Sequence, residues 1–293
     1  MLSADGKVFM YGTGSYGCLG TGHQQAINTP KQIKGLIEWK QIKSIATGTY
    51  HTICCTESEV FGWGFNSNGQ LGDGSNQNTF NPKQLKHANY EGQTFRFVAA
   101  GYYNSFVQCE SGALFGMGYG YYGCVGEGTS NKTSPTKIKG CPQDGFVQVA
   151  QSNYMAGGVT ADGKLYTWGN NPYHGHKNPN TKLHKPKLLK VRSEEDDVII
   201  QIKCTQQTTY VLSDKGKMYS WGYNYCGSLG HSNTASIYQP KPILQKDLCF
   251  VDFACAYYHC AAITKEGKLY TWGYGNVAMG RKNTTHKYCP TPV

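Results

Sequence analysis

The stretch Lys164-Leu-Tyr-Thr-Trp-Gly169 decides the fold, because versions of it recur along the whole chain. Each version is a short run of apolar and aromatic residues that stops at a glycine, the pattern of a β-strand followed by a turn. The closing glycines stand 52, 54, 51, 53 and 51 residues apart. They are Gly12, Gly64, Gly118, Gly169, Gly222 and Gly273. Self-similarity at a fixed period predicts a repeat architecture in which each repeat is one structural unit.

Tryptophan marks the same column of the repeat. Four of the five tryptophans directly precede a closing glycine: Trp63, Trp168, Trp221 and Trp272. Strand alternation puts Leu165 and Thr167 on one face of the sheet, and Tyr166 and Trp168 on the other. We expect both faces to be largely buried between neighbouring units, so the tryptophans and the closing glycines are predicted to be structural.

Each period carries four strand signals. An apolar run that ends in small residues, such as Phe95–Gly101, precedes a second run, such as Thr52–Thr56. An x-Gly pair such as Asp162-Gly163 then leads into the Trp-Gly strand, because glycine supplies the positive φ of a tight hairpin. A fourth strand is predicted to start at a proline that recurs 17 or 18 residues after each closing glycine, since an edge or first position tolerates proline. These prolines are Pro30, Pro82, Pro135, Pro186, Pro240 and Pro290.

Four antiparallel strands in each period make one blade of a β-propeller. We therefore predict an all-β propeller of about six to seven blades, with five complete blades and an N-terminal half-blade in this chain. Residues 1–293 are interpreted as a single propeller domain. The half-blade, near Lys7–Gly12 and Pro30–Lys34, is expected to lack inner strands. The ring is then open, or is completed by a longer chain or by a partner.

The consensus x-Gly-Lys-Leu-Tyr-x-Trp-Gly-x-Asn-x-x-Gly-x-Leu-Gly, with its later proline, resembles the RCC1 repeat family, as does Ala-x-Gly-x-x-His at Ala46–His51. Kelch repeats would carry a recurrent Gly-Gly pair and WD40 repeats a Trp-Asp pair, and neither recurs here. The resemblance covers essentially the whole chain and implies a propeller with RCC1-type blades. The chain departs from the family pattern in the fourth repeat, at Asn170–His176, and in the sixth, which is shortened at Asn276–Gly280.

The net charge of +10 favours acidic partners. Only three of the 28 basic residues are arginine, whose planar fork reads phosphate and guanine best, so sequence-specific nucleic-acid binding is not expected. Lysines recur directly after the repeat proline, or one place later, and are candidate partner-binding residues. They are Lys31, Lys83, Lys137, Lys187 and Lys241. The alternative is protection of an exposed edge strand, where lysine blocks edge-to-edge pairing.

Other candidate sites have weaker support. His174 and His176, in the irregular fourth loop, are candidates for partner binding in a loop expected to be solvated. No cysteine or carboxylate completes a zinc set there, so no metal site is predicted. Gly12–Gly17 and Gly118–Gly123 match G-x-G-x-x-G, but no helical pattern follows, so no cofactor site is predicted. The acidic run Glu194–Asp197 is interpreted as a solvated loop, with a contact for a basic partner as the alternative.

Two function classes follow from these observations. The first is a non-enzymatic protein–protein interaction scaffold, with a partner that has an acidic surface, within a larger assembly. The second is a guanine nucleotide exchange factor for a small GTPase, which the resemblance implies through the family's founding member. Exchange there is attributed to a wedge inserted in one blade, and the even repeat intervals show no insertion. The Gly-Trp-Arg-His-Thr motif of the family's plant photoreceptor branch is also absent, and we favour the scaffold.

The sequence also bears on the compartment. No run of about 18 uncharged apolar residues is present, so no membrane span is predicted. The N-terminus lacks the layout of a secretory signal. The twelve cysteines contain no Cys-x-x-Cys pair and are expected to serve as small apolar side chains in a reducing compartment. We therefore expect an intracellular, cytoplasmic protein, with cytoskeletal or nuclear association as the alternatives.

Overall fold

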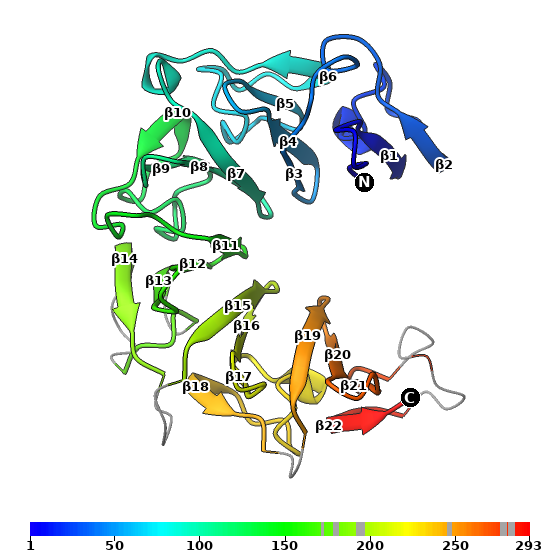
Figure 1. Cartoon of the computed structure of the whole chain (residues 1–293), viewed down its shortest axis with the longest axis vertical. Coiled ribbons are helices and arrows are strands. Elements are labelled where there is room, and N and C mark those ends of the chain that lie inside the picture. Colours follow the sequence, from blue (N-terminus) through cyan, green and yellow to red (C-terminus); the bar gives the residue numbers. More distant parts are fainter. Residues whose placement is uncertain (171–172, 178–181, 192–196, 245–247, 276–279, 281–284) are drawn as a thin grey trace. The chain divides into compact units, whose positions relative to one another are not determined.

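The computed structural model describes residues 1–170, 173–177, 182–191, 197–244, 248–275, 280 and 285–293. Its regular structure is nearly all β-strand, in five four-stranded antiparallel sheets and one two-stranded sheet (Figure 1). The described residues contain three short 3-10 turns: η1 (Ser15–Gly17), η2 (Ala88–Tyr90) and η3 (Tyr225–Gly227). Within the described part of the chain, no helix is long and apolar enough to cross a membrane.

In every sheet each strand pairs with the next strand of the chain. The two-stranded sheet contains β1 (Phe9–Gly12) and β2 (Ile27–Gln32). The next sheet contains β3 (Ser44–Thr47), β4 (His51–Cys55), β5 (Val60–Gly64) and β6 (Thr79–Gln84). It is followed by β7 (Phe95–Ala100), β8 (Asn104–Cys109), β9 (Leu114–Gly118) and β10 (Lys132–Lys137).

The remaining three sheets repeat this order. They contain β11 (Gln148–Gln151), β12 (Met155–Val159), β13 (Leu165–Gly169) and β14 (Leu183–Leu189); β15 (Ile199–Cys204), β16 (Thr208–Ser213), β17 (Met218–Gly222) and β18 (Ile237–Pro242); and β19 (Phe250–Cys255), β20 (His259–Thr264), β21 (Leu269–Gly273) and β22 (Lys287–Pro292). The predicted five complete blades and N-terminal half-blade are confirmed.

The chain divides into two compact units. The first comprises Met1–Phe146 with His184–Pro186, and the second comprises Val147–Leu183 with Lys187–Val293. In each unit the apolar core lies between successive sheets. In the first unit Trp63 of β5 packs in a cluster with Leu19 and Ile33 from the preceding repeat. In the second unit Trp272 of β21 packs with Tyr210 and Ile243.

The tryptophan column is buried, as the repeat predicts. Trp63, Trp168, Trp221 and Trp272 are all 0% exposed. Three of the indoles donate a hydrogen bond of 2.9 Å to a backbone carbonyl in the loop of the preceding repeat. The acceptors are Cys18 for Trp63, Tyr173 for Trp221 and Ser228 for Trp272. Each indole thus satisfies its buried N–H while it joins one sheet to the sheet before it.

The closing glycines are required by backbone geometry. Gly64 has a φ of +102°, a conformation that side chains disfavour. A Cβ on Gly64 would also lie 2.4 Å from the carbonyl oxygen of Tyr50, in the link between β3 and β4. The glycine that ends the third strand therefore allows the link between the first two strands to cross close beside it.

One prediction about strand boundaries is wrong. The repeat prolines lie inside the fourth strand rather than at its start; Pro186, for example, lies in the middle of β14. That strand is at the end of its sheet, so a missing N–H interrupts no further pairing. β1 pairs with β2 alone as a full strand, as the half-blade predicts, but its inner side is not empty. Leu2 forms a bridge with Val8, and the Phe9 N–H donates to the Met1 carbonyl at 2.9 Å.

Some predicted features lie outside the described residues. They are residues 171–172 of the fourth loop, 194–196 of the acidic run and 276–279 of the shortened sixth repeat.

Candidate functional site

The five candidate lysines lie on the fourth strand of their sheets. Lys31 is on β2, Lys83 on β6, Lys137 on β10, Lys187 on β14 and Lys241 on β18, and all five are exposed. Each of these strands is the end strand of its sheet. The lysines therefore stand on an edge that has no further strand beside it, which suits edge protection and partner binding equally.

Neighbours of these lysines differ between repeats. Lys83 Nζ lies 2.5 Å from Asp73 Oδ2. Burial raises the pKa of Asp73, but hydrogen bonds from Lys83 and Ser75 outweigh it, and the net pKa is lowered. In two later repeats a histidine, His176 or His231, follows the last loop glycine where Asp73 stands in the second repeat. Burial lowers the pKa of both histidines to about 4, so the imidazoles are neutral at physiological pH.

His174 is not solvent-facing, contrary to expectation. Its exposed fraction is 0%, and it takes the position of the buried leucine in the Gly-x-Leu-Gly loop, as Leu229 does one repeat later. Thr167 Oγ1 donates to the His174 carbonyl at 2.5 Å, as Ser220 Oγ donates to the Leu229 carbonyl at 2.7 Å. The His174 side chain is therefore buried rather than presented to a partner, and its loop keeps the geometry of the repeat despite its altered sequence.

His176 is half-buried, and its Nε2 lies 3.2 Å from Thr167 Oγ1. The rings of His174 and His176 are 5.4 Å apart. Among the described residues, no three His, Cys, Asp or Glu side chains gather closely enough to hold a metal ion.

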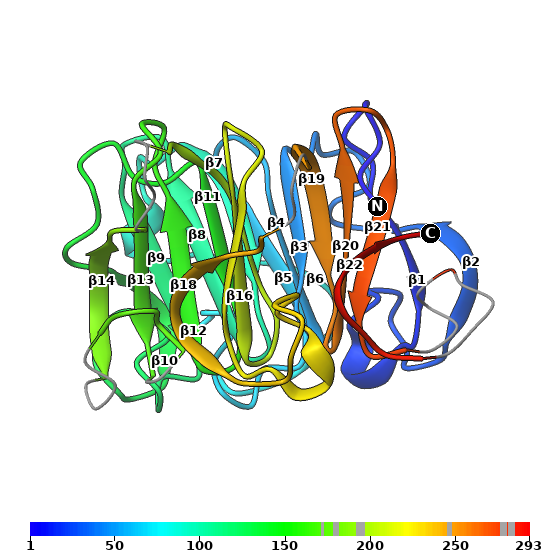
Figure 2. The same ribbon diagram turned by 90° about the horizontal axis from the view of Figure 1, so that it is seen from below.

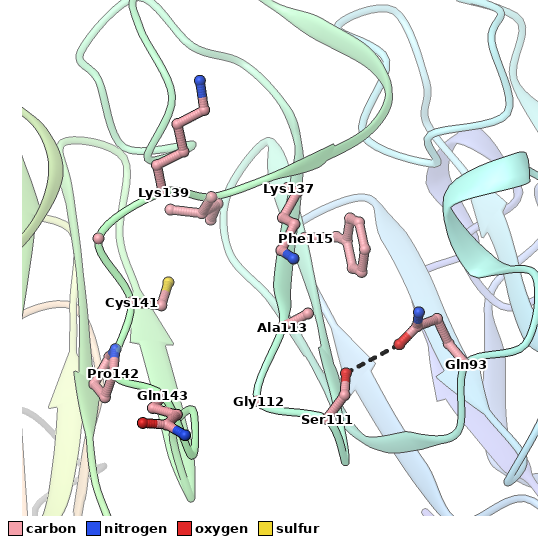
Figure 3. Close-up of a pocket in the computed structure, with 12 residues that line it drawn as sticks. Gln93, Ser111, Gly112, Ala113, Phe115, Lys137, Lys139, Cys141, Pro142 and Gln143 are labelled. Atoms are coloured by element: carbon pink, nitrogen blue, oxygen red, sulfur yellow. Dashed lines mark hydrogen bonds between the residues drawn. The ribbon is translucent and has the colours of Figure 1, made fainter.

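A cavity of about 640 Å³ lies beside Lys137 in the first unit (Figure 3). Its lining includes Gln93, Ser111, Phe115 and Cys141, and Ser111 Oγ donates to Gln93 Oε1 at 3.0 Å. The lining contains no histidine or carboxylate to act as a general base. Burial raises the pKa of the Cys141 thiol to about 12, which keeps it protonated and a poor nucleophile. The cavity is therefore a concave surface with two lysines in its lining, and its lining contains no general base or activated nucleophile.

The first-to-second links of the sheets differ in charge from their hairpin turns. Strands run between two ends (Figure 2), and antiparallel order puts the links from first to second and from third to fourth strand at the same end. We name this the tyrosine end. Its first-to-second links, at residues 48–50, 101–103, 152–154, 205–207 and 256–258, read GTY, GYY, SNY, TQQ and AYY, without a charged residue. At the opposite end every hairpin turn is charged, for example Asp214-Lys-Gly-Lys217.

Aromatic rings touch one another across the tyrosine end of the first unit. Tyr16 lies 4.8 Å from Phe65 and 5.1 Å from Tyr50, measured between ring centroids. Phe65 continues the contacts to Tyr103 at 5.9 Å, and Tyr103 to Tyr119 at 6.3 Å. The rings come from three successive repeats and form one aromatic surface.

In the second unit a similar surface surrounds a pocket of about 330 Å³. The pocket is lined by Tyr223, Tyr225, Cys226, Thr234, His286 and Tyr288. This surface was not predicted from the sequence. The sequence feature that could have predicted it is the absence of charged residues from the first-to-second links, which recur once in each repeat.

A family model described as the regulator of chromosome condensation (RCC1) repeat matches residues 5–55, 57–108, 111–156 and 215–263. A second model with the same description matches residues 42–70, 199–228 and 250–278. The ultraviolet-B receptor UVR8 of Arabidopsis thaliana is 32% identical over 276 residues, covering 92% of this chain and 61% of the receptor. The E3 ubiquitin-protein ligase HERC2 of Mus musculus is 26% identical, and the chain spans 6% of its length.

Solved structures agree on the fold. Human WBSCR16 has a TM-score of 0.58 at 19% identity, over 98% of this chain and 93% of that one. Yeast RCC1 (Prp20), solved with Kap60, has a TM-score of 0.59 at 21% identity, over 100% of this chain and 84% of that one. Together with the four-stranded sheets, this likeness confirms an all-β fold of RCC1-type propeller blades.

Proposed function

The chain belongs to the regulator of chromosome condensation repeat family, and on that basis we propose that it is a non-enzymatic scaffold for protein–protein interaction. The proposal rests on the tyrosine end. Exposed tyrosine supplies large, rigid and amphipathic contact area at low entropic cost, and it is enriched in protein interfaces. Tyr121 is 56% exposed and Tyr225 is 59% exposed, and the link that holds Tyr225 contains no lysine, arginine, aspartate or glutamate.

The chemistry of the described residues supports a non-enzymatic role. Burial lowers the pKa of His51 to about 4 and raises the pKa of the Cys55 thiol to about 12, so neither is poised for acid–base or nucleophilic work at neutral pH. His51 Nε2 instead lies 2.8 Å from Ser105 Oγ, which donates to the Gln70 carbonyl. These groups join neighbouring repeats.

The partner is proposed to be a protein with an acidic region, held within a larger assembly. Lys31, Lys137, Lys187 and Lys241 form no ion pair with a carboxylate of the described residues. Four such cations on exposed edges are available to acidic groups, while the first-to-second links of the tyrosine end supply uncharged contact. The buried cysteines, including Cys54 and Cys260, are used as apolar side chains and suit an intracellular, reducing setting.

Site-specific photo-crosslinking tests the proposal. A photoreactive phenylalanine analogue would replace Tyr121 or Tyr225 at the tyrosine end, with Ser111 or Glu266 of the hairpin turns as matched control positions. We expect crosslinks in the native cell to form at the tyrosine end and to involve a small set of proteins. Equal crosslinking at both ends, or none above background at either tyrosine, would overturn the proposal.

Guanine nucleotide exchange is the alternative function. The yeast relative Prp20p was solved in work on its binding to Gsp1p and histones. At 21% identity this likeness extends to the fold alone. Release of labelled GDP from a panel of small GTPases should be the same with and without the protein. A faster release from any of them would contradict the non-enzymatic proposal.

A further inference from the structure

The pocket at the tyrosine end of the second unit is made by two neighbouring repeats. Tyr223, Tyr225 and Cys226 come from the loop that follows β17, and Tyr288 comes from β22. Of its six lining residues none is lysine, arginine, aspartate or glutamate. Four of the six are aromatic rings. The pocket therefore favours a ligand that offers flat apolar surface and carries no charge at its point of contact.

Its rings continue beyond the pocket as a row of neighbours. Tyr223 and Tyr225 lie almost parallel, with 9° between their planes and 6.4 Å between their centroids. The next contacts are Tyr225 to Tyr258 at 6.2 Å and Tyr258 to Tyr274 at 6.2 Å. The spacing is close to the rise of about 6 Å that two residues of a polyproline II helix make.

One wall of the pocket is fixed before any ligand arrives. A Cβ on Gly227 would lie 2.2 Å from Cδ1 of Tyr288, so only a glycine lets this ring lie flat against the loop. The Gly275 N–H donates to His286 Nδ1 at 3.2 Å and holds that ring as well. A preset wall reduces the conformational entropy that binding would otherwise cost.

Hydrogen-bond donors are available at the same place. Tyr223, Tyr225 and Tyr288 are 44%, 59% and 41% exposed, and their hydroxyls donate to no other described residue. A polyproline II segment has no internal hydrogen bonds, so its carbonyl groups need donors from outside. Proline itself has no backbone N–H to satisfy. Rings and hydroxyl donors without charges therefore match what a proline-rich segment presents.

We propose that this pocket and the row of rings beside it bind a proline-rich peptide segment in the polyproline II conformation. The inference rests on the proposed function, because it names the kind of protein segment that the scaffold holds. Aromatic-lined grooves suit such segments, which are already extended and lose little entropy when they bind. Nucleic acid fits less well, because its phosphates require cationic side chains that the pocket lining lacks.

Binding of a defined probe to the full chain tests the proposal. The probe is a proline homopeptide about ten residues long, and the control peptide of equal length replaces every proline by alanine. We expect saturable binding of the proline peptide, followed by NMR shifts confined to the pocket, and no binding of the control. Tyr225→Ala should weaken binding at least about tenfold, as expected for an aromatic anchor.

Two further variants distinguish the contribution of the Tyr225 ring from that of its hydroxyl, and the effect of the pocket from that of any exposed tyrosine. Tyr225→Phe keeps the ring and removes a donor, so it should weaken binding less than Tyr225→Ala does. Tyr238→Ala is the matched control, because Tyr238 is 42% exposed on β18 and does not line the pocket. We expect it to bind as the parent protein does, and a circular dichroism spectrum would show that each variant is folded.

Several outcomes would overturn the inference. They are equal binding of the alanine peptide, binding that Tyr225→Ala leaves unchanged, or preferential and salt-sensitive binding of oligothymidine. Concentration-dependent dimerisation that Tyr225→Ala abolishes would identify a second copy as the occupant instead. Should the proline peptide fail while photo-crosslinks still form at Tyr225, the scaffold would stand and only the ligand class would be wrong.

Discussion

A single tryptophan in each repeat contributes both apolar burial and a hydrogen bond. Trp221→Ala is expected to destabilise the protein by about 3–5 kcal/mol, because it removes a fully buried indole and leaves a cavity. The Tyr173 carbonyl would lose its donor at the same time. Chemical denaturation measures the change. Trp39→Ala is the matched control, since Trp39 is 86% exposed and its loss should change stability by less than about 0.5 kcal/mol.

Histidine makes the stability of the protein depend on pH. Burial lowers the pKa of His51, His176 and His231 to about 4, while an unfolded chain titrates near 6.5. Between these values the unfolded state binds more protons than the folded state, so acid favours unfolding. The stabilisation is complete above pH 6.5 and is lost as the pH falls toward 4. The thermal midpoint should therefore decrease over this window.

Replacement of one histidine tests this account. His231→Gln keeps a polar side chain near Ser220 but cannot take up the proton, so part of the acid-induced decrease should disappear. His184→Gln, on an exposed side chain of β14, is the control and should follow the parent protein. An unchanged pH dependence in His231→Gln would show that its imidazole is not buried in a neutral form.

Individual side chains differ in how far the sequence foretold them. Trp168 and Gly169 were predictable because one backbone geometry recurs six times and tolerates few residue types. The burial of His174 was not, since the fourth loop lacks the leucine that marks the position elsewhere. The tyrosine pocket escaped prediction because its rings come from different repeats, and their contacts depend on tertiary structure.

At the level of strands, β1 and β13 have the same sequence pattern but different neighbours. β13 pairs with β12 and β14 along its length, whereas β1 pairs fully only with β2 and meets Leu2 at one bridge. Amides of Met10 and Tyr11 should therefore exchange with solvent much faster than those of Thr167 and Trp168. Hydrogen exchange by mass spectrometry measures both segments in one sample. Equal protection would mean that β1 has a second full neighbour.

The order of the strands was predictable from the sequence, but the residues at which they begin and end were not. Hydrophobic alternation and x-Gly turns specify the number and sequence of strands, because each strand needs its own side-chain period. The fourth strand was predicted to start at the repeat proline, because proline has no N–H for a strand ladder, but the strand begins before it. Whether a proline can stand inside a strand depends on whether another strand lies beyond it, and that is a property of the sheet.

At the scale of the whole molecule, substitution of the edge lysines distinguishes a role in partner binding from a role in preventing aggregation. Replacing Lys31, Lys83, Lys137, Lys187 and Lys241 by glutamine should weaken capture of an acidic partner, with less effect as salt rises. Exposed charges are screened over a Debye length of about 8 Å at physiological ionic strength. Affinity from a salt series and light scattering would be measured on the same samples. Unchanged affinity with new aggregation would show that the lysines protect edges and do not bind.

The hydrogen bond from each tryptophan indole to the preceding repeat does not depend on the side chain of the acceptor residue. Trp63, Trp221 and Trp272 reach the main-chain oxygens of a cysteine, a tyrosine and a serine. Every amino acid has this backbone oxygen, so substitutions at the acceptor positions keep the hydrogen bond between the sheets. Mutation can therefore explore new ligands at the tyrosine end while the tryptophan and the glycine stay constant. Evolvability in this protein is a by-product of anchoring its repeats through the backbone.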